Sequence, residues 1–326
     1  MTNKSLSDLT KLIEDELKEF NRLFKQSLKS NVALVDLVAR YLLRQKSKKI
    51  RPLLVLLSSK ICGGITERSY RGATMVELLH TATLVHDDVV DNAETRRTFP
   101  SINAVWKNKI AVLMGDYLLA RGLMLSVNGG DFDFLQVITN TVKRMSEGEL
   151  LQIGKTRRLN NDEATYYRII SDKTASLLST CCEIGARAAT SDGARVEALR
   201  DYGENLGVAF QIRDDILDYV GIKNLMGKPL GGDIKEKKLT LPLIYALRMA
   251  PKSEAKKIIS LIRRGAKKVD VAEVVKFTED YGGIQYADKM AHEYADRALK
   301  CLIIFEENEP RNALENLVSF IVERKN

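Results

Sequence analysis

The sequence predicts an all-α protein, a single large helical bundle of ten or more helices. Long stretches carry apolar residues at helical spacing, whereas alternating β-branched strands bounded by hairpin turns are almost absent. No proline occurs between Pro100 and Pro229, so helices can run uninterrupted through that stretch. No linker of biased composition divides the chain, and we therefore expect one domain that covers residues 1–326.

The expected helices can be located in order along the chain. Within residues 1–20, a charged amphipathic pattern places apolar residues at helical spacing, namely Leu6, Leu9, Leu12, Ile13 and Leu17. Further helices are predicted over 111–125, 134–154 and 163–189. Glycine-rich or polar segments at 128–131, 158–162, 190–193 and 224–233 mark the places where we expect helices to end.

The composition favours a soluble protein of a reducing compartment. Hydrophobic residues make up 45% of the 326 residues, which allows a substantial core. The four cysteines form no C-x-x-C pair and only three histidines occur, which argues against a zinc site or a disulfide framework. The N-terminus has no apolar h-region, and no apolar run approaches the roughly 20 residues that span a bilayer. We therefore expect a cytoplasmic protein.

The net charge of +8 indicates attraction to an anionic partner. Nucleic acid, a phosphorylated small molecule and an acidic membrane surface would all match that charge, and so would a solvated lysine-rich surface without a partner. Aromatic residues make up only 6% and do not interleave with the basic clusters, which disfavours a platform for stacking bases. We expect no nucleic-acid partner.

Two segments repeat the spacing D-D-x-x-D in apolar surroundings. They are "LVHDDVVDNAETRR" (84–97), with Asp87, Asp88 and Asp91, and "FQIRDDILDY" (210–219), with Asp214, Asp215 and Asp218. Residues i and i+4 share a helix face, so the first and last aspartates of each segment project together. Like charges this close repel one another unless a cation lies between them. One such segment could be a solvated helix end, but two in apolar settings favour a paired metal site.

The donor atoms favour Mg²⁺. Carboxylate oxygens without a nearby cluster of thiolates or imidazoles suit a hard cation. Mg²⁺ keeps several waters and is usually completed by substrate phosphates.

Basic and amide side chains accompany both acidic segments. Arg96 and Arg97 follow the first segment by about one helical turn, and Lys173 and Thr174 occur in "SDKTASLL". The others are Lys48, Arg51, Gln211, Arg213, Lys228 and Lys238. Each alone could be a surface charge, but a metal site surrounded by Lys and Arg matches a diphosphate. No P-loop and no nucleophile elbow is present, which disfavours a P-loop nucleotidase and a Ser-His-Asp hydrolase.

Several segments in order resemble the trans-isoprenyl diphosphate synthase (polyprenyl synthetase) family, in particular its long-chain octaprenyl type. They run from about residue 46 to 246. The matching segments are "KSKKIRP", "VELLHTATLVHDDVVDNAETRR", "INAVW", "AVLMGDYLLAR", "EGELLQ", "SDKTASL", "GVAFQIRDDILDY" and "GKPLGGDIKEKKLTLPLIYA".

The resemblance implies a fold, a reaction and partners. The fold would be an isoprenoid-synthase bundle around a central cavity. An allylic diphosphate would ionise while two to three Mg²⁺ ions hold the leaving diphosphate. The double bond of isopentenyl diphosphate would then attack the allylic cation, and loss of a proton would give a chain longer by five carbons. A homodimer is also implied.

The resemblance further implies roles for individual residues. Asp87, Asp91 and Asp214 would be metal ligands, with Asp88, Asp215 and Asp218 assisting them. The allylic diphosphate would be held by Arg96, Lys173, Thr174, Gln211, Lys228 and Lys238. Isopentenyl diphosphate would be held by Lys48, Arg51, His80 and Arg97. His80 alone could be a core histidine, but it lies two turns before Asp87 on the same face.

The sequence departs from the family pattern at three places. Lys46 and Ser47 stand where the family usually has two glycines, Lys49 replaces a common Arg, and Thr98 follows the arginine pair in place of Gly. These changes bear on the expected isopentenyl diphosphate site, Lys48 above all.

Small residues before the first acidic segment predict a long product. One helical turn rises about 5.4 Å, close to one extended isoprene unit. Short-chain family members commonly have an aromatic residue four or five positions before Asp87, but this chain has Thr83 and Ala82 there. We therefore expect a tunnel past these residues, with Leu79 deeper on the helix, and a product of C30 or longer, about C40. Ala82 and Thr83 could instead simply pack against a neighbouring helix.

Other functions remain open at this point. A short-chain synthase (C15–C20) and a non-catalytic subunit of a hetero-oligomeric synthase share the family pattern, although both triads are complete here. A terpene cyclase would not need "KKIRP", His80 or the second full D-D-x-x-D. A long polyprenyl chain would serve quinone side chains, and the basic balance would suit peripheral contact with anionic lipid where product leaves.

Overall fold

The structure, a computed structural model, describes residues 11–45, 49–96, 99–160, 162–220, 231–266 and 268–323. The helices up to and including the one that carries the first acidic segment are α2 (Glu14–Ser27), α3 (Ala33–Arg44), α4 (Ile50–Cys62) and α5 (Glu67–Val90). Those that follow are α6 (Ile102–Gly129), α7 (Phe132–Arg158), α8 (Glu163–Ile170), the π-helix η1 (Ser171–Ala175), α9 (Ser176–Ala189) and α10 (Gly193–Val220). The last are α11 (Gly232–Lys235), α12 (Leu241–Met249), α13 (Lys252–Arg263), α14 (Lys268–Asp280), α15 (Gly283–Cys301) and α16 (Glu309–Glu323).

The all-α prediction is confirmed in the part of the chain that the structure describes. The predicted helices over 111–125 and 134–154 lie inside α6 and α7, and 163–189 is a continuous helical stretch of α8, η1 and α9. The only strands among these residues are β1 (Thr95–Arg96) and β2 (Phe99–Pro100), a short antiparallel pair. Helices α6 and α7 are separated at Gly130, whose φ of 70° lies in the left-handed region. That glycine belongs to the predicted break at 128–131.

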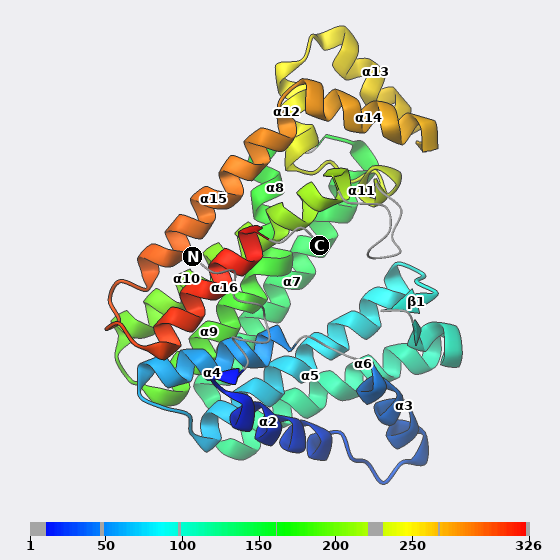
Figure 1. Cartoon of the computed structure of the whole chain (residues 1–326). Coiled ribbons are helices and arrows are strands. Elements are labelled where there is room, and N and C mark those ends of the chain that lie inside the picture. The colour runs from blue at the N-terminus through cyan, green and yellow to red at the C-terminus, as the bar shows by residue number, and fades with distance from the viewer. Residues whose placement is uncertain are drawn as a thin grey trace.

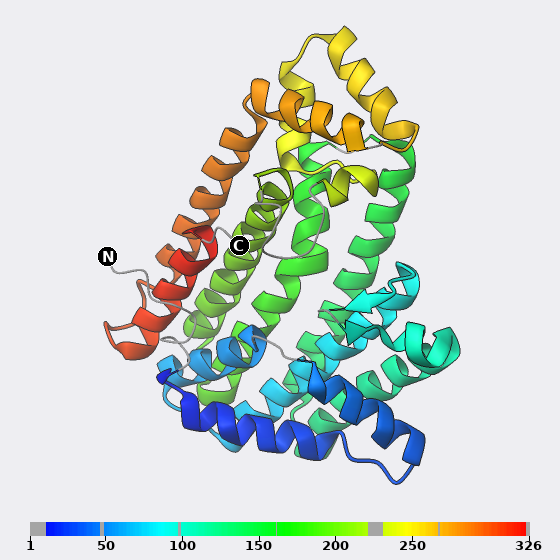
Figure 2. The same ribbon diagram turned by 45° about the vertical axis from the view of Figure 1, so that its right-hand side comes forward.

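The long helices of the second half run side by side. Helix α10 packs between α9 and α15, and α4 packs against α9. Helices α5 and α6 lie along each other beneath them, with α2 and α3 on the outside, while α12, α13 and α14 cover the opposite end (Figures 1 and 2). The short hairpin β1–β2 lies at the end of α5 that faces α11 (Figure 1).

Helix α4 is the centre of the core. Its residues Leu53–Leu57 are all fully buried, so the helix is covered on every side. A helix that is apolar all round is typical of such a position. This rigid centre supports α9 on one side and α5 on another.

Both ends of α5 are held in place, which fixes the first acidic segment. Thr66 and Ser69 form a capping box at its start. Beyond its end, the Ser101 hydroxyl caps α6 and also donates to the Ala93 carbonyl at 2.5 Å. The Tyr41 hydroxyl of α3 donates to the Pro100 carbonyl at 2.7 Å. The hairpin that carries Arg96 is therefore tied to three helices.

Helix α6 departs from the expectation that no apolar run is long enough to cross a membrane. By length and composition alone it could do so, with a mean hydropathy of 1.6 over an 18-residue window. One third (33%) of that window is buried, and α5 packs along the helix. Core helices of soluble proteins also meet this measure, because packing against a neighbour needs the same apolar residues.

Candidate active site

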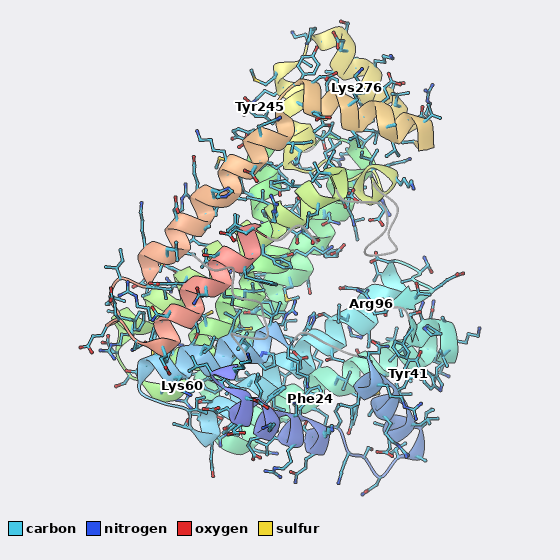
Figure 3. All side chains as sticks on the ribbon, viewed as in Figure 1. Phe24, Tyr41, Lys60, Arg96, Tyr245 and Lys276 are labelled. Atoms are coloured by element: carbon cyan, nitrogen blue, oxygen red, sulfur yellow. The ribbon has the colours of Figure 1, made fainter. Side chains whose placement is uncertain are left out.

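The first acidic segment occupies the last turn of α5. Asp87 is half-buried, Asp88 is buried and Asp91, the C-cap, is exposed. Asp88 forms an ion pair with Arg96 of β1, whose Nη2 and Nε lie 2.5 and 2.8 Å from the Asp88 Oδ1. Figure 3 shows Arg96 at the hairpin beyond α5. The hairpin thus brings Arg96, eight residues after Asp88 in the chain, back to the last turn of α5.

The second acidic segment lies near the end of α10. Asp214 is exposed, whereas Asp215 is buried and accepts hydrogen bonds from the Tyr166 hydroxyl at 2.7 Å and the Gln211 amide at 2.8 Å. Asp218 accepts from the backbone N–H groups of Gly232 and Asp233, each at 3.0 Å. Asp218 therefore fixes the loop segment at α11 against α10.

The middle aspartate of each segment is buried and forms its hydrogen bonds within the protein. Asp88 is 4% exposed and Asp215 is 5% exposed. Asp88 accepts a hydrogen bond from Arg96, and Asp215 accepts hydrogen bonds from Tyr166 and Gln211. Such charged hydrogen bonds satisfy buried carboxylates and orient the helix ends that carry them. The more exposed Asp87, Asp91 and Asp214 are therefore the carboxylates presented outward for a ligand.

Two lysines from later in the chain place positive charge near the first acidic segment. Burial raises the pKa of Asp87, and the nearby charge of Lys173 partly offsets this effect. Burial alone would lower the pKa of Lys238, but its hydrogen bond to Glu236 and the charges of Asp233 and Asp91 raise it. The charge of each lysine thus interacts with an aspartate of the first segment, although both lysines follow α7 in the chain.

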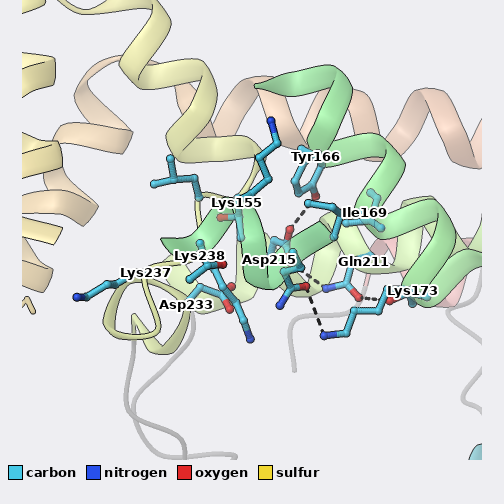
Figure 4. Close-up of a pocket in the computed structure, with 15 residues that line it drawn as sticks. Lys155, Tyr166, Ile169, Lys173, Gln211, Asp215, Asp233, Lys237 and Lys238 are labelled. Carbon is cyan, nitrogen blue, oxygen red and sulfur yellow. Dashed lines mark hydrogen bonds between the residues drawn. The ribbon is translucent and has the colours of Figure 1, made fainter. Parts of the chain in front are cut away.

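A pocket between α7, α8, α10 and the segment after α11 contains several residues that were expected to bind an allylic diphosphate (Figure 4). It is lined by predicted site residues, namely Lys173, Thr174, Gln211, Asp215 and Lys238. It is also lined by Gln152, Lys155, Thr156, Tyr166, Asp233 and Lys237, which sequence reasoning did not single out. Four lysines in one pocket make it a site for an anion.

Hydrogen bonds hold the polar wall of this pocket in place. Lys173 forms an ion pair with Glu149 of α7 and lies 3.4 Å from the Gln152 Oε1. The Thr174 hydroxyl donates to the Gln211 Oε1 at 3.0 Å, while the Gln211 Nε2 donates to Asp215. Both ends of the Gln211 amide are therefore used, and its orientation is fixed.

A second pocket lies on the other side of α5, against α2 and α3. Its polar residues include His80, which is 8% exposed, together with Lys49, Glu77, Asp88 and Arg96. Its apolar residues are Phe24, Leu28, Leu42, Leu43, Leu84, Val85 and Ile102. Figure 3 shows Phe24 on α2 below this region. Arg96, expected beside the allylic diphosphate, thus lines the pocket that contains His80.

The remaining predicted residues divide into two groups. Lys48, Arg97 and Lys228 lie outside the described residues. Arg51 is half-buried in the first turn of α4. Leu79 and Ala82 are buried in the core, each 2% exposed, and half-buried Thr83 donates its hydroxyl hydrogen bond to the His80 carbonyl at 2.9 Å.

Among the residues that the sequence reasoning missed, Glu149 and Asp233 had a signal. Both occur in segments that resemble the family, "EGELLQ" and "GKPLGGDIKEKK". Burial, followed by the charge of Asp218, raises the pKa of Asp233 to about 6. Tyr166 had no such signal, because its partner Asp215 is 49 residues away.

Replacing Asp233 with asparagine should stabilise the protein in the absence of metal at pH 7.5. The folded-state pKa is raised, so the folded protein binds this proton before the unfolded chain does as pH falls. Stability is therefore lost as pH rises from about 4 towards 6. At pH 7.5 the Asp233→Asn variant should gain about 1–3 kcal/mol in free energy of unfolding. Near pH 4 the gain should vanish.

Urea unfolding with EDTA at both pH values measures this difference, with the exposed Asp280→Asn as the matched control. An Asp233→Asn variant that is less stable than wild type at pH 7.5 would contradict the assigned cost of burying this carboxylate.

Together these features define an all-α protein with two aspartate segments near helix ends and a pocket lined by lysine, glutamine and aspartate side chains. The profile of the family described as Polyprenyl synthetase matches residues 32–278. The chain belongs to this family, and it is a prenyltransferase of the trans type.

Individual relatives cover nearly the whole chain. A short chain isoprenyl diphosphate synthase of Methanothermobacter thermautotrophicus is 33% identical over 96% of this chain and 99% of its own length. An octaprenyl diphosphate synthase of Haemophilus influenzae is 33% identical over 98% and 97%. A polyprenyl synthase of Caulobacter crescentus, complexed with calcium and isoprenyl diphosphate, matches 100% of both chains with a TM-score of 0.92 and 36% identity.

Proposed function

We propose that this enzyme condenses isopentenyl diphosphate with an allylic diphosphate, farnesyl or geranylgeranyl, in a Mg²⁺-dependent reaction. The product is an all-trans polyprenyl diphosphate of C30 or longer, about C40. The observation that carries this proposal is the pocket that gathers Lys173, Gln211, Asp215 and Lys238, because the charge of Lys173 interacts with Asp87 and that of Lys238 with Asp91 of the first segment.

The carboxylates fit a cation that the substrate helps to bind. No group of three or more His, Cys, Asp or Glu side chains is arranged to hold a metal by itself within the described ranges. Mg²⁺ is usually bound by one or two carboxylates plus phosphate oxygens, so a complete cage is not required. Asp87, Asp91 and Asp214 are the residues that would hold it. When bound, Mg²⁺ supplies positive charge to the leaving diphosphate.

The protein's own residues would orient and stabilise the reacting diphosphate. Lys173 and Lys238 place fixed positive charge where negative charge develops on the leaving oxygens. Thr174 and Gln211 are held rigidly beside them. The diphosphate would compete with Glu149 for the ammonium of Lys173. Isopentenyl diphosphate would occupy the second pocket, where His80, Lys49 and Arg96 gather.

Incubation with farnesyl diphosphate, labelled isopentenyl diphosphate and Mg²⁺, followed by chromatography of the dephosphorylated products, tests this function. A product ladder that ends at C30 or beyond is expected. Termination at C15–C20 would retain the reaction and contradict the long-chain assignment. The absence of metal-dependent incorporation with any allylic primer would instead indicate a subunit that needs a partner.

The Thr83→Phe variant should shorten the product. Thr83 is half-buried one turn before Asp87 on the same face of α5, so a phenyl ring there would narrow the predicted tunnel. We expect the main product from farnesyl diphosphate to fall to C20 while the rate of the first condensation changes less than about fivefold, because the diphosphate contacts remain. Thr83→Val, which keeps the size of the side chain and removes only its hydroxyl, is the matched control. An unchanged product length would contradict the predicted tunnel.

We also propose that the enzyme is a homodimer that joins through α6. The exposed apolar side chains of this helix are Val105, Val112, Leu113, Met124 and Val127. A second copy of the chain would cover this surface and bury it from water. The enzyme would act in the cytoplasm. It would contact anionic membrane lipid where the product leaves, and its product would provide the side chains of quinones.

The Leu113→Glu variant should dissociate such a dimer. Leu113 is 56% exposed on α6, so the substitution leaves the fold of one subunit intact but places an unpaired charge in the interface. Sedimentation velocity should show a shift from dimer to monomer. Ile303→Glu, at an exposed isoleucine beyond α15, is the control and should remain dimeric. A monomeric wild type would refute the dimer.

A further inference from the structure

A single π-helical turn interrupts the long helix that carries Lys173 and Thr174. The turn η1 (Ser171–Ala175) joins α8 to α9, and the Ser176 N–H donates to the carbonyl of Ser171, five residues earlier. An isolated π turn inserts an extra residue into a helix and occurs frequently at functional sites. Both Lys173 and Thr174 belong to this turn, and both line the pocket that also contains Gln211, Asp215 and Lys238.

Two neighbouring helices approach the π turn closely through glycines. A Cβ atom on Gly148 of α7 would lie 3.0 Å from the Asp172 Cβ and 3.1 Å from the Lys173 nitrogen. A Cβ atom on Gly207 of α10 would lie 2.4 Å from the Ala175 Cα. The backbone of the turn is therefore packed directly between α7 and α10, with no room for side chains at these two positions.

A polar cluster beside these glycines binds the turn to both helices. Arg144 lies one turn before Gly148 on α7, and its Nε donates to Asp172 at 2.9 Å. Its Nη2 donates to the Ser171 hydroxyl and to Glu204 of α10, each at 2.9 Å, and its Nη1 lies 3.3 Å from Glu204. The Ser171 hydroxyl also donates to Glu204. One guanidinium thus joins α7, η1 and α10.

The cluster lies behind the pocket wall and not in it. The described residues that line the two pockets include Lys173 and Thr174 but neither Arg144 nor Glu204. Arg144 therefore has no place to contact a substrate in the pocket. Its guanidinium instead satisfies three partners on two other elements, an arrangement that fixes geometry through bidentate contact with Glu204.

We propose that Arg144 and Glu204 are positioning residues that lock the π turn, so that Lys173 and Thr174 face the allylic diphosphate. Relaxation of this π turn to α-helical geometry would shift the register of the helix by one residue, which corresponds to about 100° of rotation because an α-helix has 3.6 residues per turn. Lys173 would then point away from Asp87. This inference rests on the proposed role of Lys173 in holding the diphosphate.

A double-mutant cycle on the full-length enzyme tests the proposal. Arg144→Met keeps the aliphatic stem but removes the guanidinium, and Lys173→Ala removes the ammonium that it is proposed to position. We expect Arg144→Met to lower kcat/KM for farnesyl diphosphate by about tenfold to a hundredfold, the loss typical of a misplaced group. We expect the double variant to be no worse than Lys173→Ala alone, because both changes remove one interaction.

The pattern of kinetic constants separates positioning from a simple loss of folded enzyme. Misplacement of Lys173 should raise KM for farnesyl diphosphate and leave KM for isopentenyl diphosphate unchanged, whereas partial unfolding lowers kcat alone. Glu204→Gln, which keeps the side chain's size, should reproduce the effect of Arg144→Met on these kinetic constants. It replaces Arg144→Met in the test if that variant folds poorly. Arg187→Met is the matched control, since this arginine of similar exposure pairs with Glu183 on α9 and should retain activity.

Three results would overturn the inference. The first is multiplication of the two losses in the double variant, which would mean that Arg144 acts independently of Lys173. The second is normal kcat/KM in both Arg144→Met and Glu204→Gln while Lys173→Ala is impaired. Normal activity in Lys173→Ala would remove the proposed role of Lys173 itself, and this inference would fall with it.

Discussion

The Asp87→Asn variant should lose about a thousandfold in kcat for chain elongation while remaining folded. Asp87 is the half-buried carboxylate of the first segment, the charge of Lys173 acts on it, and Asp91 lies on the same helix face. Asparagine keeps the shape but removes the negative charge that would hold Mg²⁺ against the diphosphate. The measurement is steady-state incorporation of labelled isopentenyl diphosphate at saturating farnesyl diphosphate.

Two comparisons make this prediction specific. The control is Asp116→Asn, an exposed aspartate of α6 beside His86, which should retain wild-type kcat. Raising the Mg²⁺ concentration should recover part of the lost activity if metal binding is the function that was weakened. Activity of Asp87→Asn within threefold of wild type would exclude Asp87 as a metal ligand.

The Asp131→Asn variant should lose about 3 kcal/mol in free energy of unfolding. Asp131, between α6 and α7, is 3% exposed and accepts hydrogen bonds from Arg68 and Arg71 of α5, with Nε to oxygen distances of 2.8 Å. Arg68 also donates to the Arg187 carbonyl of α9 at 2.8 Å. Without the carboxylate, Arg71 loses its countercharge and Arg68 keeps only Asp133, which is costly for an ion pair with a buried member.

The pH dependence of this loss has a definite sign. Burial alone would raise the pKa of Asp131, but hydrogen bonds from Arg71 and Arg68 lower it below the usual value of 3.8. The stabilisation is therefore fully present above about pH 4 and is lost as pH falls through the folded-state pKa. Urea unfolding at pH 7 and pH 3 should show a large difference between variant and wild type at pH 7 and a smaller one at pH 3.

The exposed pair of Lys18 with Asp15 provides the comparison for Asp131. Its Asp15→Asn variant should leave the free energy of unfolding almost unchanged, because solvent screens this pair. Equal effects of the two substitutions would show that the buried cluster at the start of α5 is not a determinant of stability.

Helix periodicity is local, and for that reason the sequence predicted the helices and the positions of the two aspartate segments. The spacing of Asp87 and Asp91 requires only that both lie in one helix, and α5 satisfies this condition. The stretch 163–189 was likewise predicted as helical, with the correct ends.

The parts that could not be predicted depend on contacts between distant residues. Nothing in the periodicity indicates that Tyr166 reaches Asp215 or that Arg144 reaches Glu204, 60 residues away. The π turn adds one residue inside a continuous apolar pattern, and such an insertion leaves the pattern almost unchanged. The different duties within each D-D-x-x-D segment follow from burial. The family resemblance assigned Asp88 and Asp215 an assisting role, but periodicity does not indicate that both are buried.

A crystal structure of the enzyme with Mg²⁺ and farnesyl thiolodiphosphate, an analogue that ionises slowly, tests the central claim most directly. The account predicts metal ions bound to carboxylate oxygens of Asp87, Asp91 and Asp214, with the diphosphate within hydrogen-bond distance of Lys173 and Lys238. Asp88 should remain paired with Arg96, and Asp215 with Tyr166. Metal ions bound to Asp88 or Asp215 in place of the outward-facing aspartates, or a diphosphate bound away from Lys173, would contradict it.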